Sequence, residues 1–159
     1  MTTDPTPHLL FPTCADCNRI GLPPLPGMLV AMEKALGPDV LRAFLLAYGG
    51  RDYATRRTAP DSTRDGPLGQ ADTWMQAEYS GINIHVPKGP AARTARVAFT
   101  IWTRLCEGQS LRQIATETDS TIRTVCNRKK LFMDMGVLPI ARLTNAANAS
   151  LQISHQRDA

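Results

Sequence analysis

The sequence predicts a mainly α-helical protein with a few short β-strands, in which a region of helices and strands precedes a group of C-terminal helices. In several stretches of ten or more residues, apolar side chains recur at three- and four-residue steps, as in amphipathic helices. Residues 82–86 instead alternate apolar and polar side chains, which is typical of a strand. The stretch YSGINIHVPKG at 79–89 also partly repeats an earlier YGGRDYATRRT at 48–58. This repetition suggests that one helix–strand unit occurs twice.

Length and composition limit the range of architectures. A chain of 159 residues suffices for one ordinary domain or two small lobes. Its apolar stretches are broken by charge well before the ~20 residues that a bilayer requires, and the N-terminus lacks the pattern of a secretory signal. We therefore expect a cytoplasmic protein that does not enter a membrane. The four cysteines are too few for a disulfide framework and should remain thiols.

Positive charge is concentrated in one part of the chain. Residues 88–130 contain nine Lys or Arg and three acidic residues, a net charge of +6, so the remainder carries −2 of the total +4. Such a segment suggests a polyanionic partner, although a solvated helix face would look similar. The nine cations are Lys88, Arg93, Arg96, Arg104, Arg112, Arg123, Arg128, Lys129 and Lys130.

The first 90 residues divide into an arm and a repeat region. Residues 1–26 contain six prolines, which predicts an irregular arm. In the region 27–90, the apolar periodicity of 28–48 predicts one or two helices, with Pro38 in a first turn and an end at Gly49-Gly50. Residues 56–66 are polar and should form an exposed loop.

The second copy of the repeat starts after this loop. Leu68-Gly69 echoes Leu36-Gly37, residues 71–79 have helical spacing, and Ser80-Gly81 takes the place of Gly49-Gly50. Ile82, Ile84 and Val86 then predict a strand with one buried face, and we expect this strand to contribute to dimerisation. Because an isolated pair of strands is marginal in water, the two copies should pair either within one chain or between two subunits.

The C-terminal third, residues 91–138, predicts three helices. Residues 93–107 form the first helix, Ser110 caps a second over 111–118, and a third runs from 122 to 133. Ile114 and small Ala115 would let the last two helices cross closely, with Ile122 and Val125 packed between them, which is the pattern of a helix-turn-helix. Asp119 stands where this turn often has glycine. Residues 139–159 would form a further helix or a tail.

The outward face of the last helix carries side chains suited to duplex DNA. If Ile122 and Val125 point inward, Arg123 and Asn127 point outward, and these residue types can bind guanine and adenine edges in the major groove. The other candidates suit phosphate contacts, while Lys88 and Arg93 would reach the flanking backbone. The predicted phosphate contacts are Arg112, Thr121, Thr124, Arg128 and Lys130, with Lys129 at the flank.

YSGINIHVPKG, the following Arg93 and Arg96, and EGQSLRQIATETDSTIRTV together resemble the Mor/C family of phage transcription activators. The resemblance covers roughly residues 67–131, with Gly81 and Pro87 matching the family's strand motif and residues 123–130 its recognition helix. Ser80 departs from the motif's first glycine, and the first copy lacks the proline. The resemblance implies an N-terminal dimerisation region, built from helices and strands of two subunits, joined to a DNA-binding helix-turn-helix.

The order IA…TV…LFMDMGV…ARL is also similar to the LuxR-type DNA-binding domain, in which a fourth helix supports dimerisation. Both resemblances imply DNA binding and differ mainly in where the dimer contact lies. We expect a sequence-specific transcription regulator whose two paired subunits bind an inverted repeat in double-stranded DNA. The alternative is a protein-interaction module whose N-terminal half binds RNA polymerase or another regulatory protein. An exposed apolar patch at Tyr48, Gly49 and Tyr53 would favour this alternative.

Nothing in the sequence indicates an enzyme or a cofactor. His8, His85 and His155 are scattered, and there is no phosphate loop, carboxylate pair or nucleophile elbow. Cys14-x-x-Cys17 supplies only half of a zinc site, which His8 or a second subunit would have to complete, so we expect no metal. Cys106 and Cys126 are expected to be buried or chance thiols and not nucleophiles.

Overall fold

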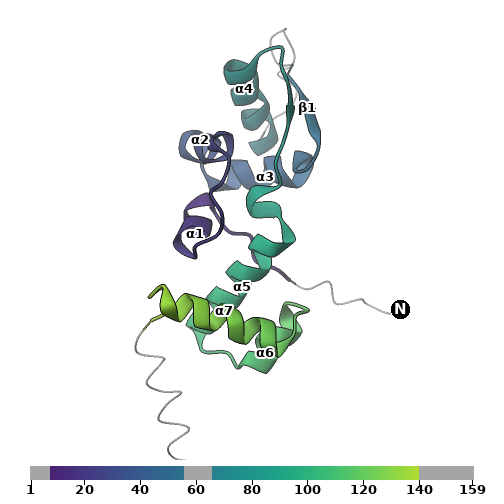
Figure 1. The fold of residues 1–159 in the computed structure, drawn as a ribbon. Coiled ribbons are helices and arrows are strands. Elements are labelled where there is room, and N and C mark those ends of the chain that lie inside the picture. The colour runs from purple at the N-terminus through teal and green to yellow at the C-terminus, as the bar shows by residue number, and fades with distance from the viewer. Residues whose placement is uncertain (1–7, 56–65, 140–159) are drawn as a thin grey trace, which may run out of the picture. The chain divides into compact units, whose positions relative to one another are not determined.

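A computed structural model describes residues 8–55 and 66–139, and within them the chain is mainly helical, as the sequence predicts (Figure 1). The helices are α1 (Cys14–Arg19), α2 (Gly27–Leu36), α3 (Pro38–Tyr48), α4 (Pro67–Tyr79), η1 (Gly89–Ala91), α5 (Arg93–Glu107), α6 (Leu111–Glu117) and α7 (Ile122–Asp134). The strands are β1 (Asp52–Ala54) and β2 (Asn83–His85). None of these helices has the length and apolar character needed to span a bilayer. Most of the predicted loop 56–66 and of the predicted tail 139–159 lies outside the described residues.

The chain divides into two compact units, and the division falls inside α5, between Phe99 and Thr100. We call residues 10–99 the N-terminal unit and described residues 100–139 the C-terminal unit.

The prediction of an irregular arm is wrong for residues 14–19, which form α1. Thr13 caps this helix, because its hydroxyl accepts from the Asp16 amide at 3.0 Å while the Asp16 carboxylate accepts from the Thr13 amide. The Glu33 carboxylate accepts from the Cys14 amide at 3.0 and 3.1 Å. Cys14 and Cys17 are buried. Residues 14–19 are therefore part of the packed N-terminal unit.

Phe11 anchors the segment before α1. The guanidinium groups of Arg42 and Arg96 lie 5.5 and 5.6 Å from the centre of its ring. Both distances are in the range of cation–π attraction, which contributes about 0.5–1 kcal/mol for a partly exposed pair. This segment is thereby held by α3 and by the first half of α5.

Gly37 separates α2 from α3. Its φ of 94° places it in the left-handed region, which favours glycine, and Pro38 starts α3 at the position predicted from the sequence. The core of the N-terminal unit lies between α2, α3 and α4. Its buried members are Cys14, Leu29, Met32, Val40, Leu41, Phe44, Leu45, Ala71, Met75 and Val86.

The helix–strand repeat is present in the structure, but its copies start at Gly-Pro and not at Leu-Gly. Gly37 and Gly66 have φ values of 94° and 91°, and each is followed by the proline that begins α3 or α4. Each helix ends in the same turn, in which Gly50 and Gly81 take φ values of 77° and 74°. Because α4 has 13 residues and α3 has 11, the end turns of the two copies are two residues further apart than their starts. The predicted match of Leu36-Gly37 with Leu68-Gly69 is therefore wrong at the helix starts.

The two strands pair with one another inside the chain, which is one of the two arrangements left open by the sequence. The register is antiparallel and places Tyr53 opposite Ile84, its equivalent in the other copy. The Val86 amide donates to the Arg51 carbonyl at 2.8 Å, and the Thr55 amide donates to the Ile82 carbonyl at 3.2 Å. A two-fold rotation about a local axis through the ladder brings each of these two bonds onto the other.

Only part of the predicted buried strand face is buried. Val86 has no exposed surface and Ile84 is half-buried, but Ile82 precedes β2 and is 54% exposed. Of the three residues predicted for dimerisation, Val86 is therefore enclosed by its own chain.

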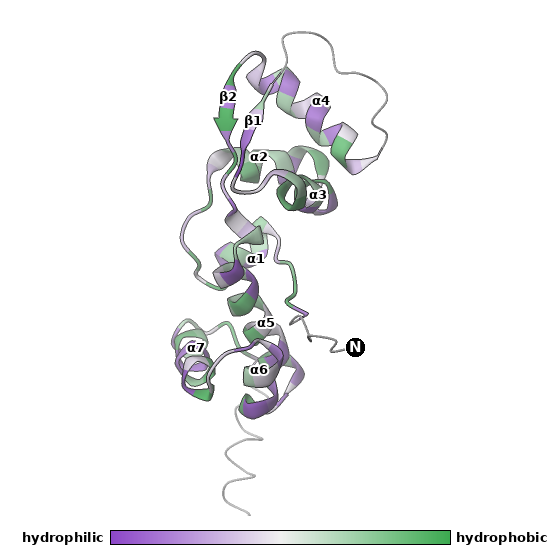
Figure 2. Cartoon of the chain, turned by 90° about the vertical axis from the view of Figure 1, so that its right-hand side faces the viewer, coloured by the Kyte–Doolittle hydropathy of each residue, from purple (hydrophilic) through white to green (hydrophobic). Residues whose placement is uncertain are grey.

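The two copies differ in the polarity of the helix residues that lie next to their shared core. Counted back from the shared end turn, where Gly50 matches Gly81, Leu41 and Leu45 of α3 correspond to Asp72 and Gln76 of α4. The two leucines are buried, whereas Asp72 and Gln76 are half-buried. Figure 2 shows the contrast, with α2 and α3 mainly hydrophobic and α4 alternating between hydrophilic and hydrophobic segments. Asp72 has a specific partner, because the Tyr53 hydroxyl donates to its carboxylate at 2.5 Å.

Candidate nucleic-acid interface

Helix α6 begins at a capping box around Ser110, as predicted. The Ser110 hydroxyl accepts from the Gln113 amide at 3.3 Å, and the Gln113 side chain accepts from the Ser110 amide at 3.2 Å. At the other end, Thr118 is fully buried, and its hydroxyl donates to the Ile114 carbonyl at 2.8 Å. This internal bond explains how a threonine occupies a core position there.

Asp119 makes the turn between α6 and α7 possible. Its φ of 49° makes it the one non-glycine residue with a positive φ in the described ranges. Aspartate tolerates this left-handed conformation better than most residues, so it can stand in for glycine. The Ser120 amide then donates back to the Ala115 carbonyl at 2.9 Å. Thr121 caps α7 by accepting from the Thr124 amide at 3.1 Å.

The inner face of α7 consists of Val125 and Phe132, both fully buried. Ala115 is also buried, at 6% exposure, in agreement with its predicted place at the crossing of the two helices. The prediction that Ile122 packs inward is wrong, because its side chain is 47% exposed. Ile122 lies three residues before Val125 and therefore points about 60° away from it around the helix axis. This angle is enough to place the first side chain of α7 outside the core.

Arg123, Asn127 and Lys130 form one exposed stripe along α7. They follow one another at steps of four and three residues, opposite the side that carries Val125 and Phe132. We call these three residues the outward stripe. Arg128 and Lys129 are half-buried at its flanks. The predicted outward placement is therefore present, while the role of each residue in binding stays a prediction.

The other predicted contact residues are placed less uniformly. Arg112 is exposed on α6. The hydroxyl groups of Thr121 and Thr124 lie 2.9 Å apart and bond to each other, so both belong to the start of α7. Lys88 and Arg93 are exposed, but they belong to the N-terminal unit.

Arg104 does not contribute its charge freely, an arrangement that the sequence did not indicate. Its guanidinium donates to Glu117 at 2.6 and 2.8 Å and to Glu107 at 2.9 Å. These bonds, Glu117 first, raise the pKa of Arg104 above its ordinary value. Two of the three acidic residues in the basic segment are thus paired with one cation. The remaining cations of the C-terminal unit are Arg112, Arg123, Arg128, Lys129 and Lys130.

The end of α7 is tied to α5. The indole of Trp102 donates to the Val137 carbonyl at 3.1 Å, and Leu138 is 8% exposed. This contact holds the segment that follows α7 against α5. The outward stripe is thus part of a helix anchored at its start by Thr121 and just beyond its end by Trp102.

The cysteine pair in α1 has the properties of buried structural thiols. Burial, together with Glu33, raises the pKa of Cys14 to about 12, and burial and Asp16 raise that of Cys17 to about 11. Both thiols are therefore protonated near neutral pH, and the thiolate is the form that attacks substrates and binds metals. Within the described ranges, no three His, Cys, Asp or Glu residues are grouped closely enough to hold a metal ion.

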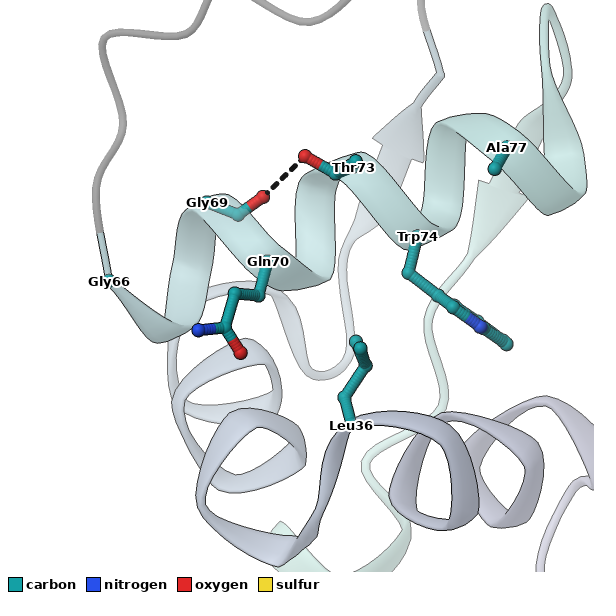
Figure 3. A pocket seen from close by; sticks show the side chains of 7 residues that line it. All are labelled: Leu36, Gly66, Gly69, Gln70, Thr73, Trp74 and Ala77. Carbon is teal, nitrogen blue, oxygen red and sulfur yellow. Dashed lines mark hydrogen bonds between the residues drawn. The ribbon is translucent and has the colours of Figure 1, made fainter.

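A shallow groove of about 680 Å³ runs along α4 in the N-terminal unit (Figure 3). Leu36 points toward α4, and Trp74 projects from α4 on the side that faces Leu36, while the Thr73 hydroxyl donates to the Gly69 carbonyl at 2.9 Å on the helical wall. None of the described lining residues carries a charge. The other described residues of the lining are Gly66, Gln70 and Ala77.

The apolar patch considered for the first repeat copy is not exposed. Tyr48 and Tyr53 are half-buried and meet edge to face at 4.8 Å, and both rings lie within 5.5 Å of Phe44. This aromatic cluster packs against the core.

Known proteins give no further information on these features. No protein-family model matches the chain, and no match is found among curated proteins or solved structures. The resemblances to the Mor/C family and to the LuxR-type domain stay predictions from sequence motifs.

Proposed function

We propose that the C-terminal unit binds double-stranded DNA as a helix-turn-helix, with α7 in the major groove, and that the protein is a sequence-specific transcription regulator. The outward stripe is the observation that carries this proposal. A helix anchored at both ends presents Arg123, Asn127 and Lys130 to solvent on the side opposite its buried residues. Arginine and asparagine form paired hydrogen bonds with guanine and adenine edges.

The spacing of the stripe suits bases about two steps apart. Residues four apart rise about 6 Å along a helix, and successive base pairs are about 3.4 Å apart. Arg123 and Asn127 would therefore read bases about two steps apart. Arg112, Arg128 and Lys130 would contact phosphates, with Thr121 and Thr124 beside them at the start of α7.

We further propose that two copies bind an inverted repeat whose half-sites lie about one helical turn apart. The strands of each chain already pair internally, so a second copy would use surfaces that this pairing leaves open. Ile82 is the predicted dimerisation residue that meets this condition, being 54% exposed just before β2.

Selection from a random pool of duplexes at two salt concentrations tests the proposal. We expect enrichment of a spaced inverted repeat bound by two chains, with an affinity that falls steeply as salt rises, because cation–phosphate contacts release counterions. Replacing both Arg123 and Asn127 with alanine should abolish the preference for that repeat. Arg51→Ala is a matched control, because Arg51 is an exposed cation of the N-terminal unit. An unchanged preference in the double variant would contradict the role of the stripe.

The groove on α4 favours a second candidate function, a module that binds RNA polymerase or another regulatory protein. The described residues of its lining carry no charge, and Leu36 and Trp74 among them suit an apolar contact. Such binding should change little with salt. Salt-independent capture of purified RNA polymerase, lost in Trp74→Ala, together with no duplex preference, would support this alternative.

A further inference from the structure

Ile122 is an exposed apolar residue beside the outward stripe. It is the first residue of α7, it precedes Arg123 directly, and its side chain is 47% exposed. Burial of an isoleucine side chain in the protein interior is favourable, yet this side chain is not buried in the core of its unit. The exposure of Ile122 beside the proposed interface therefore has to be explained.

A general apolar patch on α7 does not provide that account. The other exposed large apolar residues of the C-terminal unit are Leu131, Met133 and Met135. The nearest of these, Leu131, is nine residues further along, a rise of about 13 Å. The immediate neighbours of Ile122 are the capping Thr121 and the cationic Arg123. One turn further along, the exposed Cys126 lies on the same side of the helix. Ile122 is thus the one exposed large apolar side chain among the described residues at the start of α7.

We propose that Ile122 contacts the 5-methyl group of a thymine next to the base read by Arg123, an inference that rests on the proposed DNA-binding function. Among the groups that base pairs expose in the major groove, the thymine methyl is the apolar one, and aliphatic side chains recognise it by contact. Consecutive side chains of a helix point about 100° apart and differ by about 1.5 Å in height, so Ile122 and Arg123 reach neighbouring positions. Ile122 would then select thymine over cytosine, which has a hydrogen at the equivalent carbon.

The test removes the methyl group and nothing else. In the duplex enriched by selection, each thymine is replaced in turn by deoxyuridine, and affinities are measured for the full-length protein. We expect one thymine in each half-site to matter, with a loss of about fourfold when its methyl group is absent. Ile122→Ala should bind the thymine duplex more weakly than the unaltered protein and should no longer distinguish thymine from deoxyuridine at that position.

Leu131→Ala is the matched control, because Leu131 is a similarly exposed aliphatic residue of the same helix, at 42%. It should keep the full penalty for deoxyuridine. Circular dichroism of Ile122→Ala will establish that α7 is intact. An enriched duplex without any methyl penalty, or a penalty that survives in Ile122→Ala, would overturn this inference and leave the proposed function standing. Failure to enrich any duplex would overturn both.

Discussion

Replacing Thr55 with valine tests the two-fold pairing of the helix–strand copies. Thr55 and Val86 occupy equivalent positions in the two copies, and they have nearly the same shape. The Thr55 hydroxyl accepts from the Ile82 amide at 2.8 Å and can donate to the carbonyl of Ile82, also at 2.8 Å, or to that of Tyr79. Valine would keep the shape and remove these bonds.

The expected loss follows from what remains bonded. The Ile82 amide keeps a second acceptor, the Tyr79 carbonyl at 3.2 Å, so it is not left without a partner. The cost should therefore lie near the lower end of the range for a disrupted buried hydrogen bond, about 1–2 kcal/mol. The added methyl group of valine offsets up to about 0.8 kcal/mol of this. We expect a net loss of about 1 kcal/mol in the free energy of unfolding of the N-terminal unit.

Urea unfolding followed by Trp74 fluorescence measures this loss, with Trp102→Phe as the common background so that the signal reports the N-terminal unit. Thr55→Ser is the control, because it retains the hydroxyl and its three partners. The two-fold axis also predicts that adding Val86→Thr restores part of the stability, since the Arg51 and Tyr48 carbonyls are equivalent to those of Ile82 and Tyr79. A Thr55→Val protein at least as stable as the unaltered chain would refute the reasoning.

The turn and the buried thiols provide further tests. Asp119→Ala should be about 1 kcal/mol less stable than Asp119→Gly, because a φ of 49° strains alanine but not glycine. Thermal unfolding compares the two variants, and equal stability would contradict the strain. The folded-state pKa values of Cys14 and Cys17, about 12 and about 11, exceed the ordinary 9.0, so these thiols should cost no stability below pH 9. The free energy of unfolding should fall as pH rises from 9 toward 12, and less steeply in Cys17→Ala. At pH 8, iodoacetamide should modify exposed Cys126 before either buried thiol.

Strong local signals made the C-terminal helices predictable. The bounds of α5 follow from a long periodic stretch stopped by Gly108, and α6 from the Ser110 cap. Helix α1 was missed because six residues are too short for a periodic signal, and the surrounding prolines argued against any helix. The capping box of Thr13 and Asp16 was a local signal for this helix, but the six prolines of residues 1–26 favoured an irregular segment.

The candidate site was predicted in its outward residues and missed in its details. The positions of Arg123 and Asn127 follow from helical geometry once Val125 is taken as buried. Ile122 was misplaced because its hydrophobicity was taken to mean burial, although its angle around the helix allowed either outcome. The pairing of Arg104 with Glu117 joins residues 13 apart on different helices, and no local pattern encodes it.

Because β1 and β2 pair inside one chain, their pairing should not depend on the protein concentration. Strands on separate chains meet in a second-order reaction, so their pairing is lost on dilution. Here residues 55 and 82 belong to one chain, and the effective concentration of each strand for the other is set by the connecting segment. The ladder should therefore form equally well at the lowest concentration at which the protein is present, and its formation should follow first-order kinetics.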